Sequence, residues 1–286
     1  MKRRDFIQLT GAGALISSPL IACSQTANKL KKGDLTFQHS ICRWCYNSTP
    51  LEELADRAKD LGISSIELLH PEEWKIVQKR GINCAVGYAN DWGLTKGFND
   101  KNLHAQLLED YKRVIPMAAD SGIPNVICFS GNGNGLSYEE GLENCAVGLE
   151  PILKIAEKYN VNIIMELLNS KIDHIDYQCD STEWGVSLTD KMGSDKFKLL
   201  YDIYHMQVME GDIIATIEKY KDYIAHFHTG GVPGRNEIDE TQELNYAAIM
   251  KSLKDNGFDG YVAQEYIPTW DKPFDALAKA IDICTV

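Results

Sequence analysis

The strongest constraint on the fold is a regular alternation of short apolar segments with longer amphipathic ones. The apolar segments have the length of strands, and they cover residues 35–42, 65–69, 83–88, 125–129, 162–167, 197–203, 224–228 and 261–266. The segments between them repeat apolar residues at helical spacing, over residues 51–61, 72–80, 102–121, 139–159, 182–192, 212–220, 246–256 and 274–283. A helix therefore follows a strand eight times, which is the pattern of a parallel sheet.

This repetition favours one closed barrel over an open sheet. Eight strand–helix units in the roughly 250 residues that follow the N-terminal segment have the usual size of a (β/α)₈ TIM barrel. Four glycines follow a helical segment and precede a strand, where a helix C-cap favours glycine: Gly62, Gly81, Gly122 and Gly257. The first predicted strand is not followed by Gly-x-Gly-x-x-Gly, so a dinucleotide-binding fold is not supported. We predict a single barrel domain over residues 34–286.

The first residues have the pattern of an export signal rather than of the fold. Arg3 and Arg4 precede a short apolar stretch, and residues 1–22 are typical of a twin-arginine signal peptide. The stretch ends in Leu-Ile-Ala-Cys, which resembles a lipoprotein box with Cys23 as the lipidated residue. Residues 23–33 are expected to form a polar tether. The prediction is a protein on the periplasmic or cell-surface side, whose membrane contact is this lipid. An ordinary apolar helix, or export without a lipid, is the alternative.

Charge and cysteine content restrict the function further. The formal net charge of -12 argues against binding to nucleic acid or to an anionic membrane. Apart from Cys23, an odd number of the eight cysteines remains, so they cannot all pair in disulfides. Cys42 and Cys45 have redox spacing, but two thiols packed at a strand end is the stronger interpretation. Whether this pair is redox active stays open.

Potential metal ligands lie at the ends of four consecutive predicted strands. They are Glu166, Asp202, His228 and Glu265. Strands of such a barrel present functional side chains at their carboxyl ends, so we expect these four to converge. Three carboxylates and one imidazole suit a single Mn²⁺, Mg²⁺, Co²⁺ or catalytic Zn²⁺ ion. A bound cation would also relieve the repulsion between the carboxylates.

Each of these residues also has a structural interpretation. Glu166 or Glu265 can serve as a salt-bridge partner at the barrel mouth, and Asp202 can cap the following helix. Residues 206–211 are expected to form a loop that leads into the next helix. Strand alternation places His226 on the same face as His228 but deeper in the barrel. The joint occurrence of four ligand types on four consecutive strands favours the metal site.

The residues around these strand ends resemble one family in particular. The run Tyr-Asp-Ile-Tyr-His-Met-Gln-Val-Met-Glu-Gly at residues 201–211 is similar to the hydroxypyruvate isomerase family of xylose-isomerase-like barrels. Supporting segments are Met-Glu-Leu-Leu-Asn at residues 165–169, Val-Pro-Gly-Arg at 232–235 and Gln-Glu-Tyr at 264–266. The resemblance covers most of the chain after the signal and is clearest from residue 162 onward.

The resemblance implies roles for individual residues. It implies Glu166, Asp202, His228 and Glu265 as ligands of one divalent metal, with Glu166 and Glu265 also acting as the acid–base pair. It further implies that His205 and Arg235 contact the substrate. Arg43 and Trp44 lie at the end of the first predicted strand, and we include them as candidate substrate contacts. Core packing is an equal interpretation for Trp44, and neutralisation of an acidic mouth is the alternative for Arg235.

The predicted activity is metal-dependent isomerisation of a small hydroxycarbonyl compound, of the hydroxypyruvate and tartronate semialdehyde type, through an enediolate. Two observations keep alternatives open. Some hydroxypyruvate isomerases carry Gln at the position of His228, whereas sugar epimerases of the superfamily carry His. The export signal favours an exported epimerase or lyase that acts on a keto-sugar or glycoside. A non-catalytic sugar-binding lipoprotein is disfavoured by the two glutamates, and a nuclease by the acidic charge. Substrate, metal and oligomeric state, a homo-oligomer included, are left open.

Overall fold

Eight parallel strands form the wall of a barrel in the computed structural model, which describes residues 36–286. The strands are β1 (Gln38–Cys42), β2 (Ser65–Glu67), β3 (Val86–Gly87), β4 (Asn125–Cys128), β5 (Asn162–Glu166), β6 (Phe197–Asp202), β7 (Ile224–Thr229) and β8 (Tyr261–Gln264). Their order in the sheet is β2-β1-β8-β7-β6-β5-β4-β3. Parallel bridges from Ser65 to Asn83 and from Leu69 to Gly87 bring β2 beside β3, so the barrel is nearly closed.

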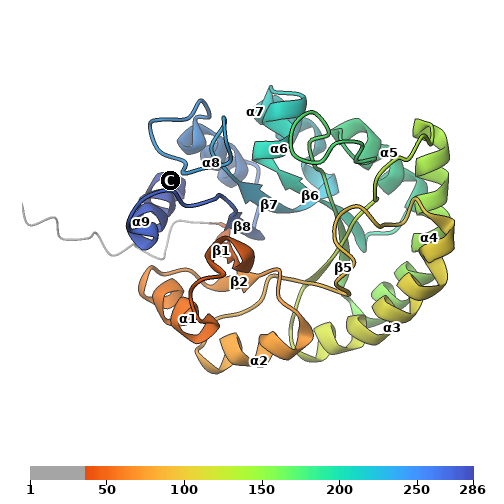
Figure 1. The fold of residues 1–286 in the computed structure, drawn as a ribbon, viewed down its shortest axis with the longest axis horizontal. Helices are drawn as coiled ribbons and strands as arrows, with labels where there is room; N and C mark the ends of the chain where they lie inside the picture. The colour runs from red at the N-terminus through yellow and green to blue at the C-terminus, as the bar shows by residue number, and fades with distance from the viewer. Residues whose placement is uncertain (1–35) are drawn as a thin grey trace, which may run out of the picture. The chain divides into compact units, whose positions relative to one another are not determined.

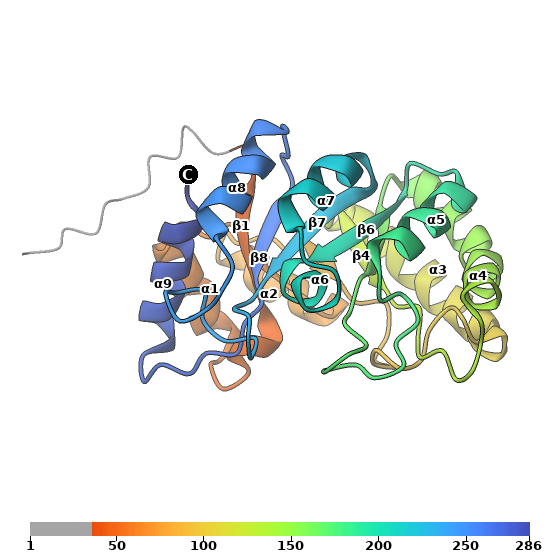
Figure 2. The same ribbon diagram turned by 90° about the horizontal axis from the view of Figure 1, so that it is seen from above.

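Helices surround the strands as an outer ring (Figure 1). They are α1 (Leu51–Asp60), α2 (Pro71–Lys79), α3 (His104–Asp120), α4 (Tyr138–Tyr159), α5 (Thr182–Met192), α6 (Ile203–Met209), α7 (Ile213–Tyr220), α8 (Tyr246–Asp255) and α9 (Pro273–Cys284). Short 3-10 helices are η1 (Arg43–Tyr46), η2 (Lys101–Leu103) and η3 (Lys221–Tyr223). The second view shows the strands running between the layers of helices (Figure 2). The predicted single-domain (β/α)₈ TIM barrel is confirmed for the described residues.

Local sequence explains where the helices begin and end. The Ser137 hydroxyl accepts a hydrogen bond from the amide of Glu140 at the start of α4, and the Glu140 carboxylate accepts one from the amide of Ser137. This reciprocal cap satisfies two amides that the helix itself leaves unpaired. The four predicted C-cap glycines have left-handed φ angles of 76°, 80°, 68° and 75°, in the order Gly62, Gly81, Gly122 and Gly257. A left-handed residue at this point ends the helix and turns the chain toward the next strand.

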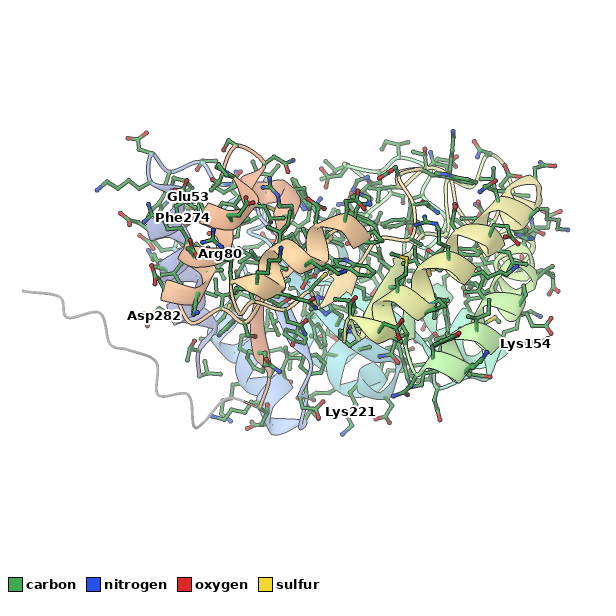
Figure 3. The ribbon with its side chains drawn as sticks, turned by 90° about the horizontal axis from the view of Figure 1, so that it is seen from below. Glu53, Arg80, Lys154, Lys221, Phe274 and Asp282 are labelled. Carbon is green, nitrogen blue, oxygen red and sulfur yellow. The ribbon has the colours of Figure 1, made fainter. Side chains whose placement is uncertain are left out.

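The helices are amphipathic and bury one face against the barrel. In α3, Leu107, Val114 and Ile115 are buried, whereas charged side chains such as Lys154 and Asp282 lie on the outer surface (Figure 3). Burial of this apolar stripe drives the helices onto the sheet. Between residues 36 and 286, no helix is both long enough and apolar enough to cross a bilayer.

The inside of the barrel is an apolar cluster beneath the polar strand ends. Its buried members are Cys42, Leu68, Ala85, Val86, Ile127, Ile164, Leu200 and Ala263. These side chains come from many different strands, so the cluster fixes the strands relative to one another. The packed interior gives a rigid base for the residues that follow at the carboxyl ends.

One local expectation is wrong. Residues 206–211 were expected to form a loop, but helix α6 starts directly after β6 and extends to Met209. The reason is the side chain of Asp202, which ends β6 and accepts a hydrogen bond at Oδ1 from the amide of His205 over 3.1 Å. An aspartate in this position is a favourable N-cap, so the helix begins without an intervening loop.

The predicted signal at residues 1–22, the tether at residues 23–33 and the lipidated Cys23 lie outside the described residues.

Candidate metal and active site

The four side chains predicted from the strand ends come together at the carboxyl end of the barrel. Glu166 and Asp202 are the last residues of β5 and β6, His228 lies near the end of β7, and Glu265 directly follows β8. The register explains their convergence, because Asp202 pairs with His228 across the two neighbouring strands. One ligand atom from each of the four residues lies within 4.8 Å of the others.

Close contacts connect these residues in a site shielded from water. His228 Nδ1 lies 2.8 Å from Glu265 Oε2 and 3.3 Å from Glu166 Oε1. Asp202 and His228 are fully buried, and Glu166 and Glu265 are only 4% and 3% exposed. Three carboxylates in so small a buried volume repel one another strongly unless positive charge is present.

Arg235 supplies part of that positive charge. Its Nη2 donates to Glu265 Oε2 over 2.6 Å and lies 3.4 Å from Asp202 Oδ2. The guanidinium lies over the rings of Trp44 and Tyr204, at 5.1 and 5.6 Å from their centroids. Arg235 itself has a left-handed backbone with φ of 56°. A non-glycine residue in this conformation is held by its surroundings, here by the aromatic rings and the carboxylates.

The surroundings give the three carboxyl groups different proton affinities. Burial raises the pKa of Asp202 well above its ordinary value, and Glu265 raises it further. Burial also raises the pKa of Glu166. Burial acts in the same direction on Glu265, but the positive charges of His228 and Arg235 outweigh it and hold the pKa of Glu265 well below its ordinary value. The two glutamates are thus pushed in opposite directions, as in an acid–base pair.

The residues present fit a divalent metal. Glu166 Oε1 is buried and has no hydrogen-bond partner, although buried carboxylate oxygens are normally satisfied. It faces the same space as His228 Nδ1, which is a nitrogen that can bind a metal when it carries no proton. A set of oxygen ligands with one imidazole nitrogen is suited to Mn²⁺, Mg²⁺, Co²⁺ or Zn²⁺. The four side chains would therefore hold one such ion.

A cavity of about 490 Å³ opens above these residues. Glu166, Glu265 and Arg235 reach its wall, whereas Asp202 and His228 lie beneath it. Much of the remaining lining is aromatic or aliphatic and includes Trp44, Tyr88, Phe129 and Leu168. Enclosed sites of about 300–1,000 Å³ with apolar walls and a few convergent polar groups are typical binding sites for small molecules.

The predicted substrate contacts occupy different places. Trp44 lines the cavity and donates from Nε1 to Glu265 Oε1 over 2.6 Å. Arg43 is not among the described residues that line the cavity, and its guanidinium donates instead to the carbonyl oxygen of Tyr46 over 2.6 Å. The 3-10 helix η1 explains this difference, because it turns the two adjacent side chains in different directions.

His205 lies behind the candidate metal ligands rather than on the cavity wall. It is fully buried, with Nε2 3.6 Å from Asp202 Oδ2 and Nδ1 2.7 Å from the side-chain amide of Asn169. Burial lowers the pKa of His205 well below its ordinary value, so the ring is neutral near pH 7. Its Nε2 has no hydrogen-bond partner. In this structure the His205 ring lies near Asp202 without a hydrogen bond to it.

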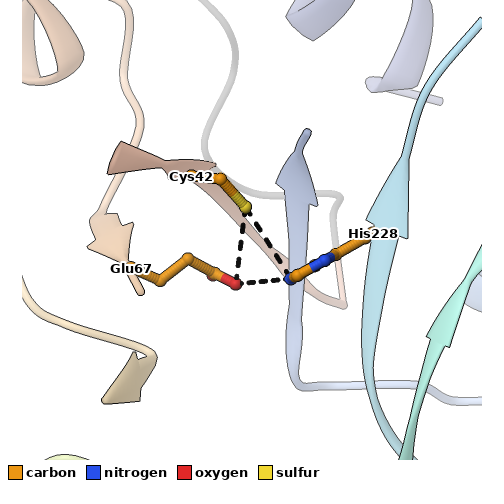
Figure 4. Close-up of side chains that lie close together, drawn as sticks. All are labelled: Cys42, Glu67 and His228. Carbon is orange, nitrogen blue, oxygen red and sulfur yellow. Dashed lines mark hydrogen bonds and ion pairs between the residues drawn. The ribbon is translucent and has the colours of Figure 1, made fainter. Parts of the chain in front are cut away.

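The structure adds a residue that the sequence prediction missed. Glu67 ends β2 and is fully buried, and its Oε1 lies 2.8 Å from Nε2 of both His226 and His228. Figure 4 shows Glu67 beside His228 and Cys42. The predicted strand over residues 65–69 places Glu67 in its middle, whereas the observed strand ends at Glu67, so a search of predicted strand ends did not find it. His226 lies deeper than His228, as strand alternation predicted.

The cysteines near the site are thiols. Cys42 and Cys45 are both free. Burial raises the pKa of each thiol well above its ordinary value. A buried thiol with a raised pKa is a poor nucleophile, so packing is the better interpretation of this pair.

Comparison with known proteins now defines the family. The sequence profile described as the xylose isomerase-like TIM barrel matches residues 55–284. The chain therefore belongs to this family. The match covers nearly the whole barrel, including all four strand ends that form the site.

Relatives within the curated proteins are isomerases. The chain is 25% identical over 237 residues to the 2-oxo-tetronate isomerase of Haemophilus influenzae, which covers 78% of this chain and 90% of that protein. It is 32% identical over 142 residues to the hydroxypyruvate isomerase of Escherichia coli, which covers 44% of this chain and 55% of that protein. Among solved structures, the 3-keto-D-glucoside 4-epimerase YcjR of E. coli superimposes with a TM-score of 0.72 over 87% of this chain and 98% of that one, at 15% identity. The curated relatives support an enzyme of the isomerase type, and the solved structure shows a shared fold.

Proposed function

We propose that the protein is a metal-dependent isomerase that moves a carbonyl group between adjacent carbons of a small hydroxycarbonyl compound, of the hydroxypyruvate and tartronate semialdehyde type. The observation that carries this proposal is the convergence of Glu166, Asp202, His228 and Glu265 on one buried point beside a cavity. Isomerase relatives of the chain support the reaction type.

The reaction needs one protein group that removes a proton from the substrate and one that returns a proton to it. Removing a proton from the carbon that bears the hydroxyl gives an enediolate. Returning a proton to the former carbonyl carbon, while the hydroxyl proton passes to the other oxygen, completes the isomerisation without an oxidant or reductant. Glu265 is suited to accept the first proton, because its low pKa keeps it ionised. Glu166 is placed to return a proton, because it is the second carboxylate beside the cavity. Both carboxylates reach the cavity wall.

When bound, the divalent ion supplies positive charge that stabilises the negative charge developing on the substrate oxygens. The other residues position the reacting groups. Trp44 holds Glu265 through its indole N–H, and its ring forms part of the cavity wall. Arg235 provides a planar pair of donors for a substrate carboxylate or hydroxyl. The apolar wall excludes water, which strengthens all of these charged contacts.

The size of the cavity favours a second candidate. A volume of about 490 Å³ lies within the range of sites that enclose drug-sized ligands and exceeds the needs of a three-carbon acid. An epimerase or lyase that acts on a keto-sugar or glycoside would use the same proton abstraction and the same ligands. The fold shared with a keto-glucoside epimerase is compatible with this candidate.

One experiment separates the two candidates. The purified protein, loaded with Mn²⁺, is assayed against hydroxypyruvate and against a panel of keto-sugars and 3-keto-glycosides. Turnover of hydroxypyruvate supports the first candidate. Turnover of keto-sugars or glycosides alone would overturn the first candidate in favour of the second, and no turnover of any of these compounds would contradict both.

We also propose that residues 1–22 direct export by the twin-arginine route and that Cys23 carries a lipid. The proposal is supported by Arg3 and Arg4 and by the Leu-Ile-Ala-Cys run that ends at Cys23. Metabolic labelling with palmitate is expected to mark the wild-type protein and not the Cys23→Ala variant. Equal labelling of the two proteins would refute the anchor.

A further inference from the structure

Glu67 makes two hydrogen bonds with a single oxygen inside the barrel. Its Oε1 lies 2.8 Å from His226 Nε2 and 2.8 Å from His228 Nε2, and all three side chains are fully buried. The two imidazole rings are nearly perpendicular, with an angle of 83° and a centroid distance of 5.2 Å. The oxygen thus lies at the meeting point of two nitrogens that approach it from different directions.

These contacts fix the protons on both rings. A carboxylate oxygen only accepts hydrogen bonds, so each Nε2 must carry a proton and donate it. The other nitrogen of His228, Nδ1, then points toward Glu166 Oε1 and Glu265 Oε2 at 3.3 and 2.8 Å. A histidine that binds a metal through one nitrogen normally donates from the other to a carboxylate or carbonyl, which holds the ring in place.

A second metal ion is the competing interpretation of this cluster. Cys42, Glu67 and His228 offer ligand atoms close to one another (Figure 4), with Cys42 Sγ 3.8 Å from His228 Nε2 and 4.0 Å from Glu67 Oε1. Glu67 Oε1 instead has a hydrogen-bond donor on both sides, at 2.8 Å from His226 Nε2 and 2.8 Å from His228 Nε2, so its contacts are accounted for without a second ion.

We propose that Glu67 is a positioning residue, which together with His226 holds the ring of His228 with Nε2 protonated and Nδ1 directed at the metal site. The proposal rests on the metal site of the proposed function and adds a residue on β2 to a set that otherwise comes from β5 to β8. Glu67 acts through His228 and contacts neither the ion nor the cavity.

The first test compares matched variants by their metal affinity. Free Mn²⁺ is measured by electron paramagnetic resonance during titration of the metal-free protein. Glu67→Leu removes the acceptor and is expected to weaken binding by about 10–100-fold. Glu67→Gln retains an acceptor oxygen and is expected to restore binding to within several-fold of the wild type. Equal affinities of Glu67→Leu and the wild type would overturn the proposal.

His226 provides a second pair of variants that remains informative if Glu67→Leu does not fold. His226→Gln keeps a donor toward Glu67, whereas His226→Leu removes it. The proposal predicts weaker Mn²⁺ binding for His226→Leu than for His226→Gln. Thermal unfolding of the metal-free variants controls for the fold. Two manganese ions per wild-type chain, with one of them lost in Cys42→Ala, would replace the proposal with the second metal site.

A readout without metal separates this inference from the proposed function. In nitrogen-15 spectra of the metal-free protein, the Nε2 protons of His226 and His228 are expected to exchange slowly with solvent, and Glu67→Gln is expected to alter both signals. Slow Nε2 protons in a wild type that binds no Mn²⁺ would refute the proposed metal site and support the Glu67 hydrogen bonds. A His228 ring protonated only at Nδ1 would overturn the inference itself.

Discussion

Arg235 Nη2 donates a 2.6 Å hydrogen bond to Glu265 Oε2, the catalytic candidate that directly follows β8 on the same cavity wall. Because Arg235 is the cation on that wall closest to the carboxylates, it balances part of their charge and remains accessible to a ligand. Its side chain is 13% exposed. The same guanidinium can therefore bind the Glu265 carboxylate in the free protein and a substrate oxygen in the complex.

Substitution of Arg235 should reduce substrate use more than stability. Arg235→Met removes a charge-assisted, two-pronged contact, and a hydrogen bond to a charged group is worth about 1.5–3 kcal/mol. We expect kcat/KM for a carboxylate-bearing substrate to fall about 10–100-fold. Arg235→Lys keeps the charge without the planar pair of donors, so its kcat/KM should lie between those of the wild type and Arg235→Met. Steady-state kinetics give the answer, and wild-type values for Arg235→Met would exclude a role in binding.

Asp202→Asn should separate metal binding from stability. Asp202 is fully buried among other carboxylates, and burial raises its pKa well above the ordinary value. Asparagine removes this charge cost and still caps α6, so the metal-free variant should unfold at the same temperature as the wild type or higher. At 100 times the dissociation constant, Mn²⁺ should stabilise the wild type by about 2.7 kcal/mol and the variant much less. Equal stabilisation of both proteins would remove Asp202 from the ligands.

The burial of His39 predicts how the stability of the protein depends on pH. It is 4% exposed, and burial lowers its pKa from 6.5 to about 4. Between these two values the unfolded chain binds a proton that the folded chain does not, so stability contributed by the neutral ring is lost as the pH falls from 6.5 to 4. The loss amounts to about 3 kcal/mol, from 1.36 kcal/mol per pKa unit. Urea unfolding across this pH range should show a smaller decrease for His39→Gln. The same decrease in both proteins would assign the acid sensitivity to other groups.

Much of the barrel was predictable because each strand and helix obeys a local rule. The predicted ends of most elements fall within two residues of the observed ones, since apolar runs, caps such as Ser137 and left-handed glycines act over short distances. The four strand-end residues could be grouped because parallel strands bring their carboxyl ends together. Their convergence follows from topology, whereas their role as ligands stays a prediction.

The features that sequence did not predict depend on contacts between distant elements. Glu67 lies 159 residues from His226 in the chain, and only the closed barrel brings β2 opposite β7. The start of α6 depends on whether the Asp202 side chain turns back to its own backbone. The path of Arg43 away from the cavity depends on η1, a single short turn. In each case the deciding interaction is a side-chain orientation, which local sequence patterns do not determine.

The most direct test of the central claim is hydrogen exchange at the substrate carbon. Wild-type protein with Mn²⁺ is incubated in D₂O with the compound it turns over, and deuterium next to the carbonyl is followed by NMR. The account predicts that the wild type and Glu240→Gln, a change at an exposed glutamate, incorporate deuterium, whereas Glu265→Gln incorporates none while keeping its fold. Undiminished incorporation by a folded Glu265→Gln protein would contradict the account.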